Sequence, residues 1–312
     1  MKKLMRTARI WTIGVLAFSF VLAGCSAPAE ESAGVVDYEA GSITTTLDEA
    51  AAALVPAGIR EAGVLNVAID IPYGSLAFYN SNNEMVGLDP DLGRLIAQKL
   101  GLTPSLNKQA FDSVIASLQA GKNDIILSGM NDTVERQATL NFIEYLYGGF
   151  ALIVAEGNPD GINSVEDLCG KSAGIQKATS QGDLLKEYSA KCVAAGKEKI
   201  TIDEFPADID AQTALRAGKT QAYVADAVVA IYAAETTDQG NAFDVVPDPS
   251  NPNGFNPLFS GLGVLNTDKA LTSAVFAAMK SLIEEGSYLK LLNLYGLGSY
   301  AVKSALLNAT KG

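Results

Sequence analysis

Residues 124–136 read Asp-Ile-Ile-Leu-Ser-Gly-Met-Asn-Asp-Thr-Val-Glu-Arg. An apolar stretch typical of a buried strand breaks at Gly129, and residues that cap helices begin at Asn131. The free N–H groups at a helix start attract anions, and Arg136, one turn further on, can add a bidentate contact to a carboxylate. We therefore predict a carboxylate clamp in this stretch. The alternative is an ordinary capped surface helix whose arginine points to solvent.

Strands and helices alternate around this stretch. Residues 48–63 read as one or two short helices interrupted by a proline, and residues 64–69 read as a strand. Apolar residues recur at helical spacing in residues 89–100 and 112–120, and each of these segments stops at a glycine. Such alternation predicts an α/β fold with mainly parallel sheets flanked by helices.

The same short sequence pattern, a helix end followed by a glycine, a lysine and a strand, occurs twice. Residues 118–122, Leu-Gln-Ala-Gly-Lys, precede a strand that finishes at Ser128, and residues 215–219, Leu-Arg-Ala-Gly-Lys, precede one that finishes at Asp226. Ligands bind at the carboxyl ends of parallel strands in open α/β sheets. If both ends line one cleft, a ligand meets Arg136 from one side and Asp226 from the other. Chance similarity of two amphipathic helices is the alternative.

The N-terminal residues read as an export signal. Residues 1–24 begin with basic side chains, continue with an apolar run that is too short for a membrane span of about 20 residues, and end in Leu-Ala-Gly before Cys25. This ending resembles a lipobox, so we predict lipid attachment at Cys25 and an extracytoplasmic protein anchored to the cell membrane. A cleaved signal peptide without a lipid is the alternative. Residues 25–46 are small, polar and acidic, and predict a flexible tether.

The charge and the residue types exclude several functions. Removing residues 1–24 takes away four basic side chains and leaves 19 of 23 against 35 acidic ones. Such an acidic surface repels polyanions, so we expect no nucleic-acid partner. The chain contains no histidine, which excludes Ser-His-Asp, Cys-His and His-metal arrangements. We predict no metal, no cofactor and no catalytic residue.

Two further cysteines, Cys169 and Cys192, occur in a chain that is predicted to be exported. Exported compartments favour oxidation, and two cysteines without histidine seldom bind zinc, so a disulfide is the simplest interpretation. Two unpaired thiols are the alternative.

Seven short segments, in this order and spacing, resemble the family 3 solute-binding proteins of ABC importers. The resemblance covers about residues 64–298. The segments are Val67-Ala68-Ile69-Asp70-Ile71-Pro72-Tyr73, Met85-Val86-Gly87-Leu88-Asp89-Pro90-Asp91-Leu92, Phe111-Asp112, Ser128 to Arg136, Val165-Glu166-Asp167-Leu168, Gly174-Ile175-Gln176 and Tyr223-Val224-Ala225-Asp226.

The resemblance implies a two-lobed periplasmic-binding-protein-like fold of type II with a two-strand hinge. Lobe 1 would comprise residues 47–151 and 257–312, and lobe 2 residues 152–256. It further implies a monomer, not an enzyme, that captures a polar amino acid between the lobes and delivers it to an ABC permease and its ATPase.

The resemblance also implies a role for individual residues. Arg136 would hold the ligand α-carboxylate, helped by backbone N–H groups near Asn131 and Ser180. Asp226 would take the α-ammonium, together with the Gly129 carbonyl or the Asn131 side chain. The implied ligand-binding set is Asp70, Tyr73, Phe111, Ser128, Gly129, Asn131, Arg136, Gln176, Thr179, Ser180 and Asp226.

Three of these positions bear on the ligand side chain. Tyr73 and Phe111 would sandwich it, whereas ordinary core packing is their alternative. Asp70 would face its distal end, although an aspartate at a strand end can also cap a turn. Because Arg136 and Asp226 satisfy a zwitterion, an additional carboxylate favours a cationic side chain. Ala178 stands where the family often has glycine, so the turn there is expected to differ.

Two other functions fit the same residues. The resemblance extends to exported dehydratases on the same fold, in which Lys177, beside the second-lobe turn, would take part in acid–base chemistry. The other alternative is a ligand-sensing subunit that signals to a membrane receptor.

Overall fold

The computed structural model describes residues 37–311. The predicted signal peptide, the lipid-attachment residue Cys25 and the first part of the tether lie outside the described residues. Within residues 37–311, no helix has both the length and the apolar character that a bilayer crossing requires.

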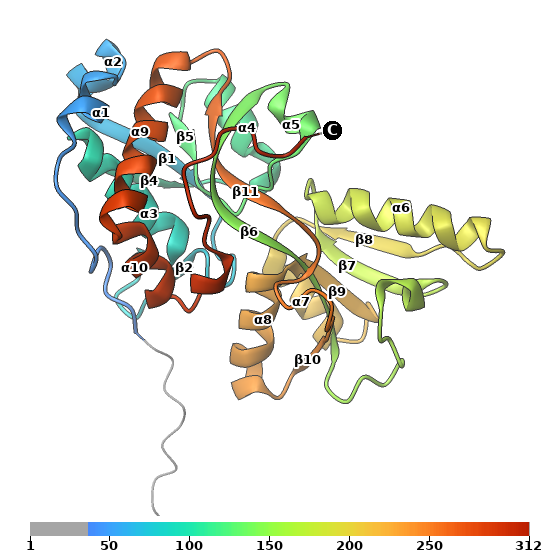
Figure 1. Cartoon of the computed structure of the whole chain (residues 1–312). Coiled ribbons are helices and arrows are strands. Elements are labelled where there is room, and N and C mark those ends of the chain that lie inside the picture. The colour runs from blue at the N-terminus through green and yellow to red at the C-terminus, as the bar shows by residue number, and fades with distance from the viewer. Residues whose placement is uncertain (1–36, 312) are drawn as a thin grey trace, which may run out of the picture. The chain divides into compact units, whose positions relative to one another are not determined.

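The elements follow one another as strands and helices of two lobes (Figure 1). The first part of the chain forms α1 (Glu49–Ala53), α2 (Ala57–Ala62), β1 (Val64–Ile69), β2 (Phe78–Tyr79), β3 (Met85–Val86), α3 (Leu88–Leu100), β4 (Thr103–Lys108), η1 (Phe111–Ser113), α4 (Val114–Gln119), β5 (Ile125–Ile126), α5 (Val134–Gln137) and β6 (Leu140–Ala155). The middle forms η2 (Val165–Leu168), β7 (Ser172–Gln176), α6 (Ser180–Ala194), β8 (Thr201–Phe205), α7 (Asp208–Arg216), β9 (Ala222–Asp226), α8 (Ala227–Thr236), η3 (Thr237–Gly240), β10 (Phe243–Val246) and β11 (Phe255–Leu265). The last elements are α9 (Lys269–Glu285), α10 (Ser287–Leu294) and η4 (Gly298–Tyr300).

One continuous sheet with the order β4-β1-β5-β11-β6-β9-β7-β8 runs through both lobes, and β10 also pairs with β6. We call the part around β4, β1 and β5 the first lobe, and the part around β9, β7 and β8 the second lobe. Within each lobe these neighbours pair in parallel. The long strands β6 and β11 are antiparallel and cross between the lobes. The predicted α/β two-lobed fold is confirmed.

Local sequence explains the helices of the first lobe. Helix α3 buries Leu92, Leu95 and Ile96 on one face and ends at Gly101, whose φ of 70° has the left-handed value that ends a helix without a Cβ clash. Pro56 separates α1 from α2 as the sequence predicts. Helices α9 and α10 pack with α3 on the first lobe.

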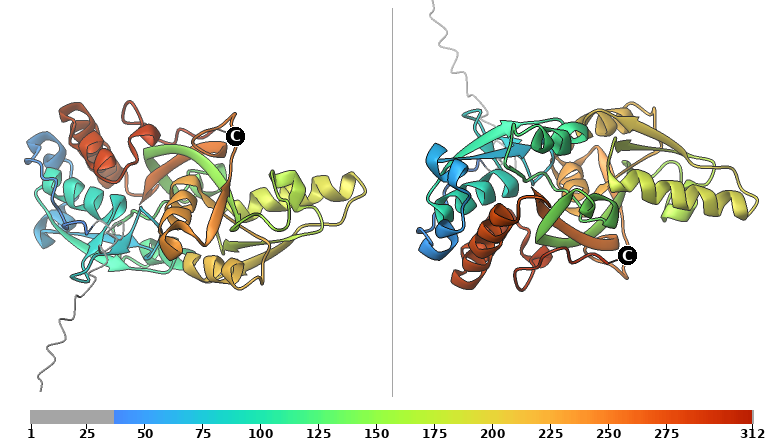
Figure 2. Two further views of the ribbon diagram at one scale, coloured as in Figure 1. Left: turned by 90° about the horizontal axis from the view of Figure 1, so that it is seen from below. Right: turned by 90° about the horizontal axis from the view of Figure 1, so that it is seen from above.

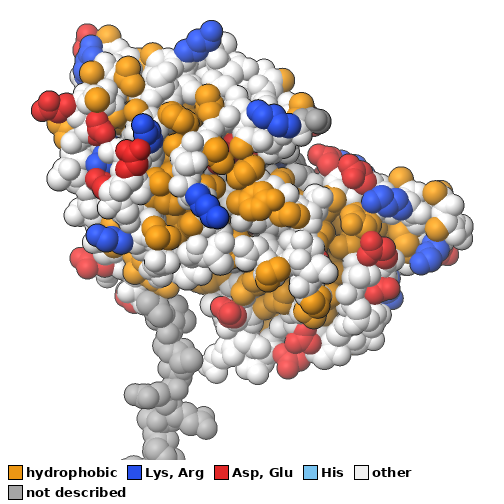
Figure 3. All heavy atoms as spheres, in the orientation of Figure 1, with side chains coloured by type: hydrophobic (Ala, Val, Ile, Leu, Met, Phe, Trp, Pro, Cys, Tyr) orange, Lys and Arg blue, Asp and Glu red, His pale blue; other side chains and the backbone are white. Residues whose placement is uncertain are grey.

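The second lobe has a core of its own, formed by apolar residues of β6, β7, β9 and α6. In both views of Figure 2, α6 runs outward, and its C-terminal end lies far from the helices of the first lobe. Basic and acidic side chains are interspersed over the face shown in Figure 3.

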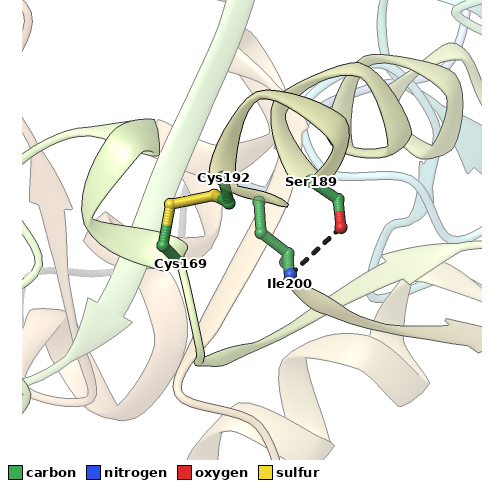
Figure 4. Close-up of a disulfide and its surroundings, with 4 residues drawn as sticks. All are labelled: Cys169, Ser189, Cys192 and Ile200. Atoms are coloured by element: carbon green, nitrogen blue, oxygen red, sulfur yellow. Dashed lines mark hydrogen bonds between the residues drawn. A yellow bond between two sulfur atoms is a disulfide. The ribbon is translucent and has the colours of Figure 1, made fainter. Parts of the chain in front are cut away.

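Cys169 and Cys192 form a disulfide that joins the end of η2 to α6, with 5.6 Å between their Cα atoms (Figure 4). Beside it, the Ile200 N–H donates to the Ser189 hydroxyl at 3.1 Å. The prediction of a disulfide is therefore confirmed, and the alternative of two free thiols is wrong.

Residues 37–46, which the sequence assigns to the tether, pack against the first lobe. The Tyr38 ring lies 4.7 Å from that of Tyr295. The Gly41 N–H donates to Asp91 at 3.0 Å, and the Thr45 N–H donates to Gln98 at 2.9 Å. Side chains of α3 thus accept hydrogen bonds from the backbone of residues 37–46, although the sequence of this segment shows no helix or strand periodicity.

Candidate functional site

The site is built where strands of both lobes end. Strand β5 is followed by Ser128 and Gly129, and β9 ends at Asp226. Between them, the loop after β5 leads to α5, which Thr133 caps by accepting the Arg136 N–H at 3.2 Å. The predicted helix start and its cap are therefore present.

Asp226 is a buried carboxylate that contacts the opposite lobe. Its Oδ2 accepts a hydrogen bond from the Tyr73 hydroxyl at 2.5 Å, and its Oδ1 accepts one from Asn131 Nδ2 at 3.0 Å. Burial raises the pKa of this carboxyl, and the bonds from Tyr73 and Asn131 and the charge of Arg136 oppose that shift. The arrangement favours a ligand group that brings positive charge or further donors.

Arg136 supplies the opposite charge from the first lobe. Its Nη1 donates to the Asn131 carbonyl at 2.8 Å, and its Nη2 donates across the lobes to the Ala178 carbonyl at 2.9 Å. The guanidinium carbon lies 5.6 Å from the centre of the Phe111 ring. Burial lowers the pKa of Arg136, whereas the charge of Asp226 raises it.

Asn131 connects these two charges. In addition to its bond to Asp226, its Nδ2 donates to the Ser260 hydroxyl at 3.0 Å, and its Oδ1 accepts from the Ser180 hydroxyl of the second lobe. One amide side chain thus contacts β11 and the start of α6. This hydrogen bonding holds the donor and acceptor groups of the site in fixed positions.

A second pair across the lobes lies at Asp70, which follows β1. Its Oδ2 accepts from Gln176 Nε2 at 2.6 Å, and its N–H donates to the Ser128 hydroxyl at 2.9 Å. Burial raises the pKa of Asp70, and the bond from Gln176 opposes that shift. Thr179 donates to the Gln176 carbonyl at 2.6 Å and so stabilises the turn after β7.

Two backbone conformations shape the site. Gly129 has φ of 56°, and a Cβ there would lie 2.8 Å from the Tyr73 ring, so glycine is required. Its N–H donates to Asp89 Oδ2 at 2.9 Å. With alanine in place of the family's glycine, the turn at residue 178 was expected to differ. Ala178 nevertheless has φ of 62°, the left-handed conformation that glycine adopts without strain. The turn therefore forms with alanine, at a cost of about 1–2 kcal/mol.

The structure brings the predicted ligand-binding residues together, but some of them line a groove and others are buried. Arg136, Thr179 and Ser180 line an open groove of about 370 Å³ between the lobes, together with Asp183, Lys186 and other residues. Asp70, Tyr73 and Asp226 are buried behind it, in contacts between the lobes.

Sequence reasoning missed two polar contacts of this region. Lys177 lies 2.5 Å from Asp112 of the opposite lobe, so the residue considered for enzyme chemistry is held in an ion pair. Asp208 is buried at the start of α7, where it accepts hydrogen bonds from the Tyr223 hydroxyl and from Gln212. Burial raises the pKa of Asp208 to about 7. The spacing of Asp208 and Gln212 on one helical face was the signal available for it.

Residues 65–298 match the family described as bacterial extracellular solute-binding proteins, family 3. The chain belongs to this family. The arginine-binding protein ArgT of Corynebacterium glutamicum is 32% identical over 310 residues, which cover 98% of this chain and 97% of ArgT.

Solved structures share the fold. An ancestral arginine-binding protein bound to arginine matches with a TM-score of 0.66 and 27% identity over 75% of this chain and 98% of that one. The ancestral amino acid-binding protein AncCDT-1, a precursor of cyclohexadienyl dehydratase, matches with a TM-score of 0.67 and 28% identity over 76% of this chain and 97% of that one.

Proposed function

We propose that this protein captures a polar amino acid between its lobes and delivers it to the permease and ATPase of an ABC importer. Arg136 binds the α-carboxylate and Asp226 binds the α-ammonium. The single observation that carries this proposal is the pair itself: the partly buried Arg136 of the first lobe and the buried Asp226 of the second, joined through Asn131.

The hydrogen bonds of the two groups are ones that an amino acid can replace. Arg136 donates to two neutral carbonyls, and a carboxylate in their place adds the attraction of opposite charges and a bidentate geometry. Asp226 accepts from neutral donors, and an ammonium there offsets the cost of its burial.

A cationic side chain is the favoured extension of this ligand. Once the zwitterion neutralises Arg136 and Asp226, the Asp70 carboxylate remains buried with the neutral Gln176 as its hydrogen-bond donor. A guanidinium or ammonium group at that end supplies the missing charge. The resemblance to ArgT, which is named for arginine, supports the same ligand class.

A thermal-shift panel of all common amino acids, several amines and several organic acids tests the proposal. Ligand at 100 times its dissociation constant stabilises by about 2.7 kcal/mol, and each kcal/mol raises Tm by about 2–4 °C for a domain of 150–250 residues. The protein is first partially unfolded and refolded to remove bound ligand. We expect the largest shift with arginine or lysine.

Two variants make this panel specific. Arg136→Ala removes the proposed carboxylate contact and should abolish the shift. Arg216→Ala removes an arginine whose ion pair with Asp238 lies on the surface, and it should leave the shift unchanged. A shift only with ligands that lack an α-carboxylate would contradict the proposal, and tighter binding of glutamate would contradict the cationic preference.

Membrane attachment through a lipid on Cys25 is a separate part of the proposal, supported by the small residues that precede this cysteine. Mass spectrometry of the N-terminal peptide after expression in the native cell tests it. We expect acylated Cys25 as the first residue. A free N-terminus without acyl chains would contradict the anchor but leave the binding proposal standing.

A further inference from the structure

The segment that follows η4 returns to the ligand-binding face. Figure 1 shows the C-terminal end beside α5. Leu307 forms an antiparallel bridge with Ile143 of β6. The Asn308 N–H donates to the Phe142 carbonyl at 3.0 Å, and the Glu144 N–H donates to the Leu306 carbonyl at 3.2 Å. This segment therefore pairs with β6 in the first lobe.

Thr310 bridges the two ends of α5. Its N–H donates to Asp132 Oδ2 at 2.9 Å, immediately before the helix. Its carbonyl accepts from Gln137 Nε2 at 3.0 Å, at the last residue of the helix. Gln137 Nε2 also donates to Asp132 Oδ1 at 2.7 Å. Asp132, Gln137 and Thr310 thus form a ring of three hydrogen bonds, which we call the α5 clamp.

The clamp encloses the helix turn that carries Arg136. Helix α5 has only four residues, and a single turn has little stability of its own because nucleation is unfavourable. Asp132 is fully buried, so its hydrogen bonds replace the solvation that it has lost. Asn131, which contacts both Arg136 and Asp226, directly precedes Asp132.

Glu144 supports the same segment from β6. Its Oε1 accepts the Ala309 N–H at 3.1 Å, while its buried Oε2 has no hydrogen-bond donor among residues 37–311. Burial raises the pKa of Glu144 to about 8, and the neighbouring charge of Asp132 adds to that shift, whereas Lys311 opposes it. A neutral Glu144 carboxyl can share its proton with Asp132, so the two acids lie together without repulsion at neutral pH.

We propose that the α5 clamp is a positioning device for Arg136, through which Thr310 sets the affinity of the site for a ligand carboxylate. Thr310, Asp132 and Gln137 are positioning residues, since each acts through the helix turn rather than on the ligand. The effect of the clamp on ligand affinity rests on the proposed function, whereas its effect on the stability of α5 does not.

The first test measures the helix without ligand. Thr310→Pro in the full chain removes the N–H that donates to Asp132, and Thr310→Ala keeps it. Hydrogen exchange of the Arg136 and Gln137 amides should accelerate at least tenfold in Thr310→Pro and stay unchanged in Thr310→Ala. Gln137→Ala, which leaves the backbone of the C-terminal segment intact, should accelerate exchange of the Arg136 amide. Unchanged exchange in both Thr310→Pro and Gln137→Ala would overturn the proposal, whatever the ligand.

The second test measures L-arginine binding by calorimetry. Thr310→Pro should weaken binding by roughly threefold to thirtyfold, the range typical of residues that modulate a site without touching the ligand. In an Arg136→Lys background the loss should be smaller, because a lysine ammonium lacks the planar fork that needs orientation. Equal losses in both backgrounds would mean independent effects and overturn the proposal. Failure of the parent to bind any amino acid would instead reject the proposed function, and the exchange experiment would still decide the clamp.

Discussion

The Tyr73 hydroxyl of the first lobe donates a hydrogen bond to the Asp226 carboxylate of the second lobe. The contact is buried on both sides, and Asn131 supplies a second donor to the same carboxylate. The residue that we propose as the ammonium-binding group is therefore also a contact between the lobes. Under the proposed function, ligand binding and lobe closure would share this carboxylate, as in proteins that close around a ligand by a hinge motion.

Asp226→Asn separates the two roles. The amide is isosteric but neutral, so amino acid affinity should fall by about 100-fold or more, since breaking a buried charge pair costs about 3–5 kcal/mol. Stability without ligand should stay equal or rise at pH 7. Burial raises the pKa of Asp226, and a carboxyl with a raised pKa loses stability as pH increases. Calorimetry and thermal unfolding measure the two effects, and a large loss of ligand-free stability would contradict this assignment.

Glu144→Gln should increase stability in a pH-dependent way. Burial raises the folded pKa of Glu144 from 4.5 to about 8. Between these values the folded state retains a proton that the unfolded state has lost, so the free energy of unfolding falls as pH rises and levels off above about 8. The variant lacks this dependence. Urea unfolding at pH 5, 7 and 9 should show an advantage that grows from pH 5 to 8, and a constant difference would count against a raised pKa.

The ion pair between Lys177 and Asp112 joins the lobes at partly exposed positions. Such pairs contribute about 0.2–1 kcal/mol, so Lys177→Ala should speed ligand release by no more than about fivefold, with a smaller effect at high salt. Lys280→Ala, which breaks an exposed pair within α9, is the matched control and should leave release unchanged. A loss of binding altogether on Lys177→Ala would give this lysine a direct role that the structure does not indicate.

The disulfide should stabilise the second lobe without influencing the site. Replacing both Cys169 and Cys192 by alanine should cost about 2–4 kcal/mol of unfolding free energy, because the bridge joins η2 to α6. Ligand affinity at a temperature well below Tm should remain within twofold. Reduction of the parent protein with dithiothreitol should lower its unfolding free energy to that of the double variant. A large fall in ligand affinity would show that the disulfide is coupled to the cleft.

Elements with a strong local signal were predicted well. The face of α3 and its glycine stop are both local properties, as is the capping of α5 by Thr133. The strand β1 coincides with the predicted residues. Residues 37–46 show the limit of this reasoning, because their order comes from acceptors on α3 and from Tyr295, which are far away in the sequence.

The alternation of strands and helices, the family resemblance and the residue types that a zwitterion requires can all be derived from the amino-acid sequence, because hydrophobic periodicity and capping are local. Which of these groups contact one another follows from the three-dimensional fold. The Ala178 carbonyl reaches Arg136, Gln176 reaches Asp70, and Thr310 reaches Asp132. These contacts depend on how β6 and β11 bring the lobes together and on where the C-terminal segment pairs, and the pattern around each residue carries no information about a partner dozens of positions away.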